Sequence, residues 1–419
     1  MKGDDLLYYY KCLDKLLLSS HEYTTLQPAD ESEVKQYPGI LYYLYAMDPF
    51  TTRKSFSISD ASLLYLKEEG LHLLQFHQQQ EEALPSWLLK KIEERKVMGI
   101  NTAFPNWRVM LHHQPPQKWR IHIAGLGDVG GTLLTGLRLL GGAYIDAIGI
   151  YDKASDKLKR WCYEVNQVYS SGNHCFPEID AITEDEMFRC DMFVFCIAKA
   201  VPPIGEEAKD VRMIQFEENA KIIRTFAKRA RTAGFKGIFA VVSDPVDLLC
   251  KVVLDASNTD ELENYDFQGL APEQIRGYGL GVMYARALYF AKENPKTSHF
   301  MEEGRAFGPH GEDLIIADSI ENYNESLSLY LTNKAKTANL EIRDLGFKPY
   351  IAPALSSGSL SILATIKGDW HYSATYIGGV YMGSRNRLNS SGVEIERLSL
   401  PDLLFNRLKN TYDNLRNVL

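Results

Sequence analysis

A glycine-rich segment between a strand and a helix constrains the fold of this chain more than any other feature. The segment 125–130, GLGDVG, follows the apolar run 119–124 and opens the amphipathic run 129–140. In such a GxGxxG turn the first glycine permits a tight turn, the second lets the backbone approach a pyrophosphate, and the third lets helix and strand pack closely. The free amides and the dipole of the helix N-terminus favour phosphate binding. The predicted dinucleotide contacts are therefore Gly125, Gly127, Asp128, Val129 and Gly130.

An acidic residue at the end of the next strand indicates which dinucleotide binds. Asp152 stands 22 residues after Gly130 and directly follows the apolar run 144–151. A carboxylate at this place accepts hydrogen bonds from the adenosine ribose and repels a 2′-phosphate, so NAD is favoured over NADP. Ala198, after the apolar run 191–197, is a further predicted cofactor contact. The alternative is a glycine-rich turn without a ligand, but the strand, helix and acid in register favour the cofactor.

Strands and helices alternate after residue 118, which predicts an α/β fold. Expected strands cover 119–124, 144–151, 191–197 and 237–242, and expected helices cover 129–140, 153–169 and 211–233. Short continuous apolar strands between amphipathic helices are typical of a parallel sheet that is covered on both faces. We therefore expect a Rossmann-type, doubly wound sheet.

The first 117 residues are predicted to form a small accessory domain. The chain of 419 residues is long enough for two or three domains, because a single core usually stops growing near ~250–300 residues. The boundary is the polar, proline-containing segment 112–118, HHQPPQK. Before it, serine or aspartate residues ahead of apolar runs with helical spacing predict helices over 59–74 and 86–97. The composition of 39–45 is typical of a strand. This α/β or α+β domain carries no recognisable chemistry.

Composition and charge narrow the classes of partner. The net charge of -8 argues against a nucleic-acid backbone or an anionic membrane as the main partner. The six cysteines form no CxxC pair and no dense cluster, which indicates reduced thiols. No run reaches the ~18 apolar residues of a membrane span, and charges interrupt the N-terminal segment, so we expect a cytoplasmic protein. No cysteine/histidine cluster predicts a metal site.

Several segments together resemble one enzyme family. IAGLGDVGGTLLTGL with IDAIGIYD, then VVSDPVDLL, LAPEQIRGYGLGVMYAR, GPHGEDLI and the C-terminal run GGVYMGSRNRLNSSGVEIERLSL occur in the order seen in lactate/malate dehydrogenases. The resemblance covers residues 118–419. It implies an NAD-binding Rossmann domain over 118–277 and an α+β catalytic domain over 278–419. It also implies a homo-oligomer, either a dimer or a tetramer.

The resemblance assigns roles to three residues. His310, in the GPHG segment, would exchange the proton with the substrate carbonyl or hydroxyl, and the ordinary histidine pKa near ~6.5 suits that task. Arg286 would bind the substrate carboxylate through two parallel hydrogen bonds. Arg212 would close over the substrate from a mobile loop and polarise its carbonyl. The plainer alternatives are a loop histidine and two solvated arginines.

Three departures from the family pattern affect the predicted chemistry. Met283 stands where the family has the aspartate that pairs with the histidine, and losing such a partner is costly in comparable sites. Asp244 replaces the asparagine of the V-S-N-P-V-D segment, where it could replace the missing partner or repel an anionic substrate. Pro203 replaces the arginine that binds the second carboxylate in malate dehydrogenases, which disfavours a dicarboxylate.

The sequence thus predicts an NAD-dependent oxidoreductase acting on a small anionic 2-hydroxy or 2-oxo acid. Its catalytic residues would be His310, Arg286, Arg212 and Asp244. The alternative is a catalytically impaired, dehydrogenase-like protein that binds NAD(H) as a sensor or scaffold, with the N-terminal domain as its output. An NAD-using glycosidase on a similar fold would need a cysteine/histidine metal site, which the sequence does not supply.

Overall fold

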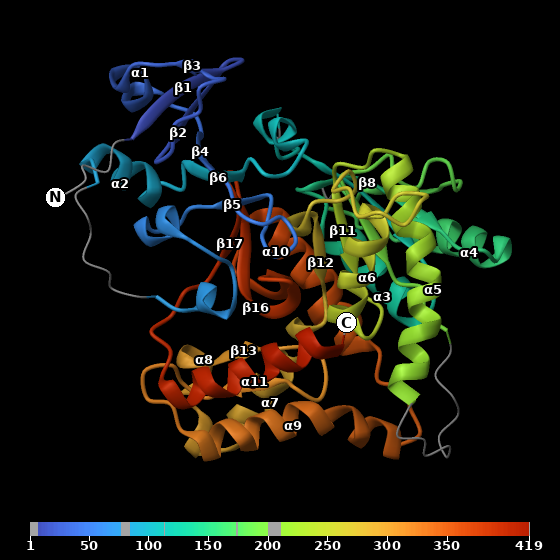
Figure 1. The fold of residues 1–419 in the computed structure, drawn as a ribbon. Helices are drawn as coiled ribbons and strands as arrows, with labels where there is room; N and C mark the ends of the chain where they lie inside the picture. Colours follow the sequence, from blue (N-terminus) through green and yellow to red (C-terminus); the bar gives the residue numbers. More distant parts are fainter. Residues whose placement is uncertain (1–6, 77–83, 113, 173–174, 200–210, 419) are drawn as a thin grey trace.

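The large sheet has the topology that the glycine-rich segment predicts. The computed structural model describes residues 7–76, 84–112, 114–172, 175–199 and 211–418 (Figure 1). The strands of the large sheet are β7 (Trp119–Ala124), β8 (Ile145–Tyr151), β9 (Glu178–Ala181), β10 (Met192–Phe195), β11 (Ile238–Val241), β12 (Ile275–Gly277), β15 (His371–Ile377), β16 (Val380–Asn389) and β17 (Gly392–Ile395). The order β9-β8-β7-β10-β11-β12, with parallel pairing throughout, is the Rossmann order. The expected fold class is therefore confirmed.

Antiparallel strands extend this sheet toward the C-terminus. β15 pairs with the edge strand β12, and β16 and β17 follow in an antiparallel meander. A separate ribbon pairs β13 (Arg305–Phe307) with β14 (Ile315–Ala317). The remaining elements of this half are α7 (Leu280–Glu293), η5 (Pro295–Thr297), α8 (Phe300–Glu303), α9 (Glu325–Asp344), η6 (Pro353–Leu360), α10 (Ser361–Lys367) and α11 (Asp402–Val418). In Figure 1, α9 and α11 lie below the sheet, close to α7 and the β13 ribbon.

Helices cover both faces of the parallel strands. These are α3 (Asp128–Leu140), α4 (Ser155–Asn166), α5 (Val211–Thr232) and α6 (Val246–Asn258), and the short η4 (Pro272–Gln274) precedes β12. Along β10, Met192 and Val194 join the core formed with α3, whereas Phe193 and Phe195 join the core formed with α5 and α6. Because alternate side chains are buried on opposite faces, the strand is apolar throughout. β9 buries only Ile179, so no apolar run predicts it.

The N-terminal region contains its own six-stranded sheet, of order β3-β1-β2-β4-β6-β5. Its elements are β1 (Tyr8–Cys12), β2 (Lys15–Ser19), β3 (Gln27–Pro28), α1 (Glu31–Gln36), β4 (Leu41–Tyr45), β5 (Ser55–Ser57), η1 (Ala61–Tyr65), η2 (Leu71–Leu74), α2 (Ser86–Glu93), β6 (Val97–Asn101) and η3 (Trp107–His112). The expected strand over 39–45 is present as β4.

Two expected helices of this region differ from the structure. Residues 59–74 form two short 3₁₀ helices, η1 and η2, instead of one α-helix, because the chain turns at Gly70 to bury the leucines of both segments. The helix expected over 86–97 ends at Glu93. Arg95 then adopts a positive φ of 57°, and Val97 begins β6, which pairs with β4. Tertiary packing has overridden local helix propensity at both places.

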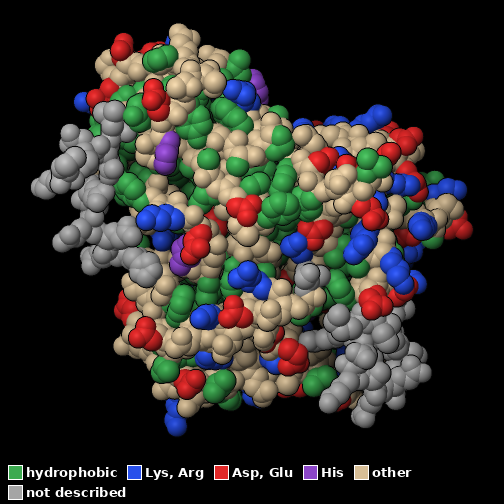
Figure 2. Space-filling model, viewed as in Figure 1, with side chains coloured by type: hydrophobic (Ala, Val, Ile, Leu, Met, Phe, Trp, Pro, Cys, Tyr) green, Lys and Arg blue, Asp and Glu red, His purple; other side chains and the backbone are tan. Residues whose placement is uncertain are grey.

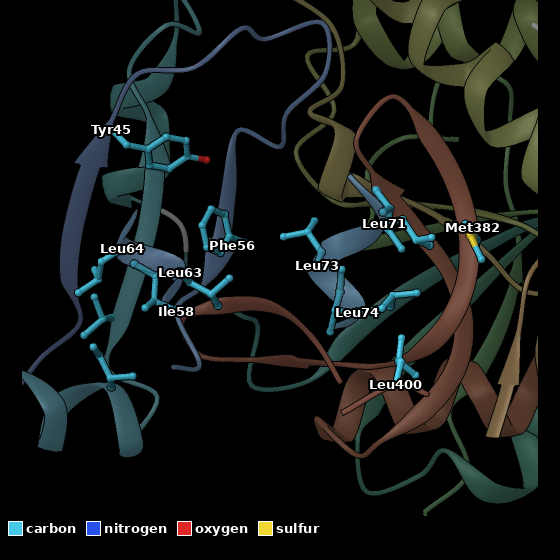
Figure 3. Close-up of a cluster of buried hydrophobic side chains, with 14 of the residues drawn as sticks. Tyr45, Phe56, Ile58, Leu63, Leu64, Leu71, Leu73, Leu74, Met382 and Leu400 are labelled. Atoms are coloured by element: carbon cyan, nitrogen blue, oxygen red, sulfur yellow. The ribbon is translucent and has the colours of Figure 1, made fainter. Parts of the chain in front are cut away.

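The N-terminal region shares a hydrophobic core with the C-terminal elements. Figure 3 shows Leu71, Leu73 and Leu74 of η2 beside Met382 of β16 and Leu400. A buried polar contact reinforces this junction, because the hydroxyl groups of Ser57 and Ser391 are hydrogen-bonded at 2.7 Å. The N-terminal region is therefore packed against the C-terminal elements.

The face of the molecule in Figure 2 is mixed in charge. On the face that Figure 2 shows, basic and acidic side chains are interspersed. All six cysteines are free thiols. None of the helices that the structure describes is long and apolar enough to cross a membrane.

Candidate functional site

The predicted cofactor residues and the predicted catalytic residue Asp244 follow the carboxyl ends of neighbouring parallel strands. The glycine loop follows β7, Asp152 follows β8, Ala198 lies beyond β10, and Asp244 lies between β11 and α6. These strands pair in parallel, so their carboxyl ends meet at one edge of the sheet. Ligands of open α/β sheets bind outside this edge. The fold therefore gathers the predicted residues in the place where such a fold binds nucleotides.

The glycine loop is tight at its first and third glycines and open at its second. Gly125 has a φ of 95°, and a Cβ there would lie 2.8 Å from the backbone nitrogen of Ile197. A Cβ on Gly130 would lie 1.9 Å from the Gly125 carbonyl oxygen. Gly127 is exposed, and a Cβ on it would meet no protein atom within 4 Å. This free space above the helix N-terminus fits a pyrophosphate that approaches the backbone.

Asp152 is held against the loop by several donors. Its Oδ2 accepts from the backbone N–H of Leu126 at 2.9 Å and from Lys157 Nζ at 2.8 Å, and its Oδ1 accepts from the backbone N–H of Ala154 at 3.0 Å. Burial raises the pKa of Asp152, but the hydrogen bonds from Lys157 and the two amides outweigh it, so the pKa is lowered overall. The carboxylate is therefore ionised and oriented. Lys157 was not predicted, and its only signal is a lysine in the first turns of the following helix.

The other predicted cofactor residues lie around the same loop. Asp128 begins α3 and pairs with Lys348 Nζ at 3.1 Å, on the exposed rim. Val129 is half-buried within the first turn. Ala198 is exposed and lies two residues beyond Cys196, whose backbone N–H donates to the Ala124 carbonyl at 2.8 Å. Asp128 and Val129 thus lie in the first turn of α3, and Ala198 follows the strand next to β7.

His310 and Asp244 form a direct pair. His310 Nδ1 lies 2.9 Å from Asp244 Oδ1. Burial lowers the pKa of His310, but the charge and hydrogen bond of Asp244 outweigh this effect and that of Arg286, so the pKa is raised overall. Asp244 therefore holds the His310 ring from the segment between β11 and α6, whereas Met283 lies in α7.

Local sequence fixes the position of His310 in the loop between β13 and β14. Gly308 has a φ of 89°, and its N–H donates to the Gly383 carbonyl at 2.9 Å. On the facing chain, a Cβ on Gly279 would lie 2.9 Å from the Cβ of His310. The glycines of both segments therefore permit the close approach that brings His310 to Asp244.

Arg286 lies close enough to this pair to act on it electrostatically. It projects from α7, and its Nη1 contacts Met283 Sδ at 3.5 Å and the Ala335 carbonyl at 3.4 Å. Burial lowers the pKa of Arg286, whereas the charge of Asp244 raises it. No described carboxylate lies within ion-pair distance of its guanidinium. The cation is therefore available to an acidic ligand, next to the His310–Asp244 pair.

The side chains of two residues of the predicted lid lie outside the described part of the structure. Arg212 lies in the first turn of α5, but its side chain is outside the described residues. Pro203 lies outside the described residues as well.

Asp247 is a residue of the site that was not predicted. It lies in the first turn of α6, three residues after Asp244, and its Oδ2 accepts from the backbone N–H of His310 at 3.3 Å. Burial raises its pKa to about 7, more than the hydrogen bond from His310 and the charge of His310 lower it. The signal in the sequence was the second aspartate of VVSDPVD. Asp247 thus supports the loop that presents His310.

We expect Asp247→Asn to raise the free energy of unfolding relative to that of the parent, and to raise it more at pH 8 than at pH 5. An aspartate that keeps its proton up to about pH 7 in the folded state, but only to 3.8 when unfolded, loses stabilisation as pH rises between these values. The asparagine removes this loss while keeping an oxygen for the His310 amide. The gain in the free energy of unfolding at pH 8 should be on the order of 2 kcal/mol, measured by urea unfolding at both pH values. An equal difference in the free energy of unfolding between variant and parent at both pH values would contradict the raised pKa of Asp247. The control is Asp255→Asn, on the exposed side of α6.

Comparisons with known proteins indicate the same fold. Residues 119–265 match the family described as "lactate/malate dehydrogenase, NAD binding domain". The "L-lactate dehydrogenase 2" of Staphylococcus aureus (strain Newman) is 23% identical over 333 residues, covering 72% of this chain and 98% of that protein. A lactate dehydrogenase from a Medee basin deep-sea metagenome library superposes with a TM-score of 0.58 at 19% identity, over 72% of this chain and 98% of the other. The malate dehydrogenase of Archaeoglobus fulgidus, solved with NADH, gives 0.55 at 18%, over 71% and 97%.

Proposed function

The chain belongs to the lactate/malate dehydrogenase family, and we propose that it is an NAD-dependent dehydrogenase of a small 2-hydroxy or 2-oxo acid. The observation that carries this proposal is the His310–Asp244 pair, with its 2.9 Å contact, beside the half-buried cation of Arg286. A proton carrier and a carboxylate-binding group together are what the reaction requires. As in other members of the family, we propose that the protein works as a homo-oligomer.

The cofactor site follows from the open glycine loop. The amides at the start of α3 and the space at Gly127 would hold the pyrophosphate, and Asp152 would accept the ribose hydroxyls. NADH bound there supplies the hydride. Lys157 keeps the Asp152 carboxylate ionised and aimed at the loop.

The protein side chains would complete the reaction as follows. Arg286 binds the substrate carboxylate, which places the adjacent carbonyl within reach of His310. Asp244 accepts from Nδ1, so Nε2 of His310 carries the proton that is donated to the carbonyl oxygen. Asp247 holds the backbone of His310 from the other side. Asp244 would thus perform the orienting role in which the family uses the residue now replaced by Met283.

The proposed substrate is a monocarboxylate. Pro203 has no charge with which to bind a second carboxylate, and Asp244 is a negative charge that opposes one. We expect NADH oxidation in the presence of 2-oxo monocarboxylates such as pyruvate or 2-oxobutyrate, and slower oxidation with oxaloacetate. A preference for oxaloacetate would contradict this assignment, and turnover with none of the panel would remove the dehydrogenase proposal.

Asp244→Asn should move the pH dependence of 2-oxo acid reduction to lower pH. Reduction needs protonated His310, so the rate is retained below the histidine pKa and lost as pH rises through it. Without the carboxylate charge, burial and Arg286 lower the pKa of His310 unopposed by Asp244, so the falling limb of the rate moves to lower pH. The measurement is kcat/KM for reduction across pH 5–9. An unmoved limb would contradict the pairing, and Asp313→Asn in the same loop is the matched control.

One observation favours the second candidate, an NAD(H)-binding sensor or scaffold. Met283 is buried against Arg286, so the sequence lacks the usual aspartate while retaining the cofactor fold. The shared core between the N-terminal region and the C-terminal elements would then carry the signal. Tight NADH binding without turnover on any 2-oxo acid would support this candidate.

A further inference from the structure

A lysine neutralises the acidic residue that was expected to select NAD. Asp152 directly follows β8, and Lys157 lies in the first turns of α4 (Figure 1). The Lys157 Nζ is 2.8 Å from Asp152 Oδ2, the Asp152 side chain is 10% exposed, and the Lys157 side chain is 40% exposed. An aspartate at this place disfavours a 2′-phosphate through its negative charge, whereas a cation beside the ribose accommodates one. The net charge of the Asp152–Lys157 pair is zero, so the repulsion of a 2′-phosphate is largely removed.

The pair retains free donors on Lys157 and few free acceptor sites on Asp152. Asp152 already accepts from Lys157 and from the backbone N–H groups of Leu126 and Ala154. A carboxylate has about four acceptor sites, so one remains for a ribose hydroxyl. An ammonium group has three N–H donors, and among the described residues Lys157 uses one of them, on Asp152. The others are available to a group bonded to the ribose 2′-oxygen, because that oxygen lies next to the Asp152 carboxylate when the ribose is bound there.

Neighbouring side chains add positive charge at the same turn. The segment 152–160, DKASDKLKR, contains four basic and two acidic residues, although the whole chain has a net charge of -8. Lys153 is exposed, and no carboxylate in the described part of the chain lies within ion-pair distance of it. Glu184, beyond the neighbouring strand β9, is already paired with Arg229 at 2.6 Å. The turn therefore attracts a phosphate monoester, which carries a charge of about −1.5 to −2 at pH 7.

We propose that Lys157 is a specificity-determining residue that lets the cofactor site accept a 2′-phosphate, so that the protein binds NADPH as well as NADH. The inference rests on the cofactor site proposed above and concerns which dinucleotides enter it. With NADH, Lys157 stays on Asp152, which accepts from a ribose hydroxyl. With NADPH, Lys157 donates to the 2′-phosphate and offsets the charge of Asp152. Position 157 thus sets the ratio of the two affinities from the adenosine end of the cofactor.

The test is a fluorescence titration of the full chain with NADH and with NADPH. In the parent, the dissociation constant of NADPH should lie within about tenfold of that of NADH. Lys157→Gln should weaken NADPH binding by at least about tenfold, because a hydrogen bond to a charged group is lost, and NADH binding by less than about threefold. Asp152→Asn should shift the ratio toward NADPH, since it removes the negative charge and keeps Lys157. Lys159→Gln removes the same charge from an exposed position of α4 and should leave the ratio unchanged.

The outcomes separate this inference from the proposed cofactor site. Saturable NADH binding with NADPH more than about tenfold weaker in the parent would overturn the inference and leave the cofactor site standing. Equal weakening of both nucleotides by Lys157→Gln would assign the lysine a purely structural role and would overturn its part in specificity. Binding of neither nucleotide to the parent would overturn the inference and the cofactor site together. None of these results depends on whether the protein oxidises NADH.

Discussion

Replacing His310 by glutamine should lower kcat/KM for 2-oxo acid reduction by about 10²–10⁴-fold, which is the usual contribution of a positioned proton donor. Glutamine retains a polar side chain of similar reach but cannot carry the proton. NADH binding should be nearly unchanged, because His310 projects from the β13–β14 loop rather than from the glycine loop. The measurement is steady-state reduction together with a fluorescence titration of NADH.

The chain offers a matched control for this substitution. His299 also pairs with a carboxylate, Asp318, at 3.1 Å, but it lies at the start of α8 outside the proposed site. His299→Gln should leave turnover within about twofold, since surface changes away from a site have small effects. Equal losses in both variants would indicate a general effect on stability and would contradict a special role for His310.

Alanine at Gly127 should weaken NADH binding by at least about tenfold without changing the thermal midpoint. Gly127 has a φ of -73°, which alanine adopts without strain, and its Cβ would meet no protein atom within 4 Å. The added methyl group would instead occupy the space proposed for the pyrophosphate. Differential scanning fluorimetry and NADH titration on the same preparation separate the two effects.

Gly130→Ala provides the opposite case in the same loop. Its Cβ would lie 1.9 Å from the Gly125 carbonyl oxygen, so both stability and NADH binding should fall. If Gly127→Ala bound NADH as tightly as the parent, the pyrophosphate would not lie above this loop, and the cofactor assignment would be wrong.

The sequence predicted the Rossmann half because local and tertiary preferences agree there. The residues of β10 are apolar on both faces and are buried against helices on both sides, and β7 buries Trp119, Ile121 and Ile123 in the core formed with α3. Close backbone contacts require the glycines of the loop, so their spacing can be recognised in the sequence. Where local propensity and tertiary packing favour the same structure, that structure can be predicted from the sequence.

The N-terminal region was harder to predict because distant residues decide its local structure. The leucines of 59–74 are spaced as in a helix, yet they form two 3₁₀ segments that pack on β16 and residues near Leu400. Helix α2 ends early because Val97 is required in β6. Neither partner is near in sequence, so no local pattern reveals them.

The sequence indicated the residues of the candidate site, but it left open whether Asp244 pairs with His310 or repels an anionic substrate. The motif around His310 indicated the histidine, but its contact with Asp244 spans 66 residues and depends on how the β13–β14 loop meets the end of β11. Asp247 escaped notice because its role is a contact with a backbone N–H. Lys157 escaped because a lysine on a solvated helix face is common.

The most direct test is a transfer of deuterium from NADH deuterated at nicotinamide C4 to a 2-oxo monocarboxylate. The two stereoisomers of the labelled cofactor are incubated separately with the protein and pyruvate, and the product is analysed by mass spectrometry. One isomer should give a 2-hydroxy acid with one deuterium at carbon 2, and His310→Gln should lower the rate of its formation by about 10²–10⁴-fold. NADH that binds but transfers no label to any 2-oxo acid would contradict the dehydrogenase assignment.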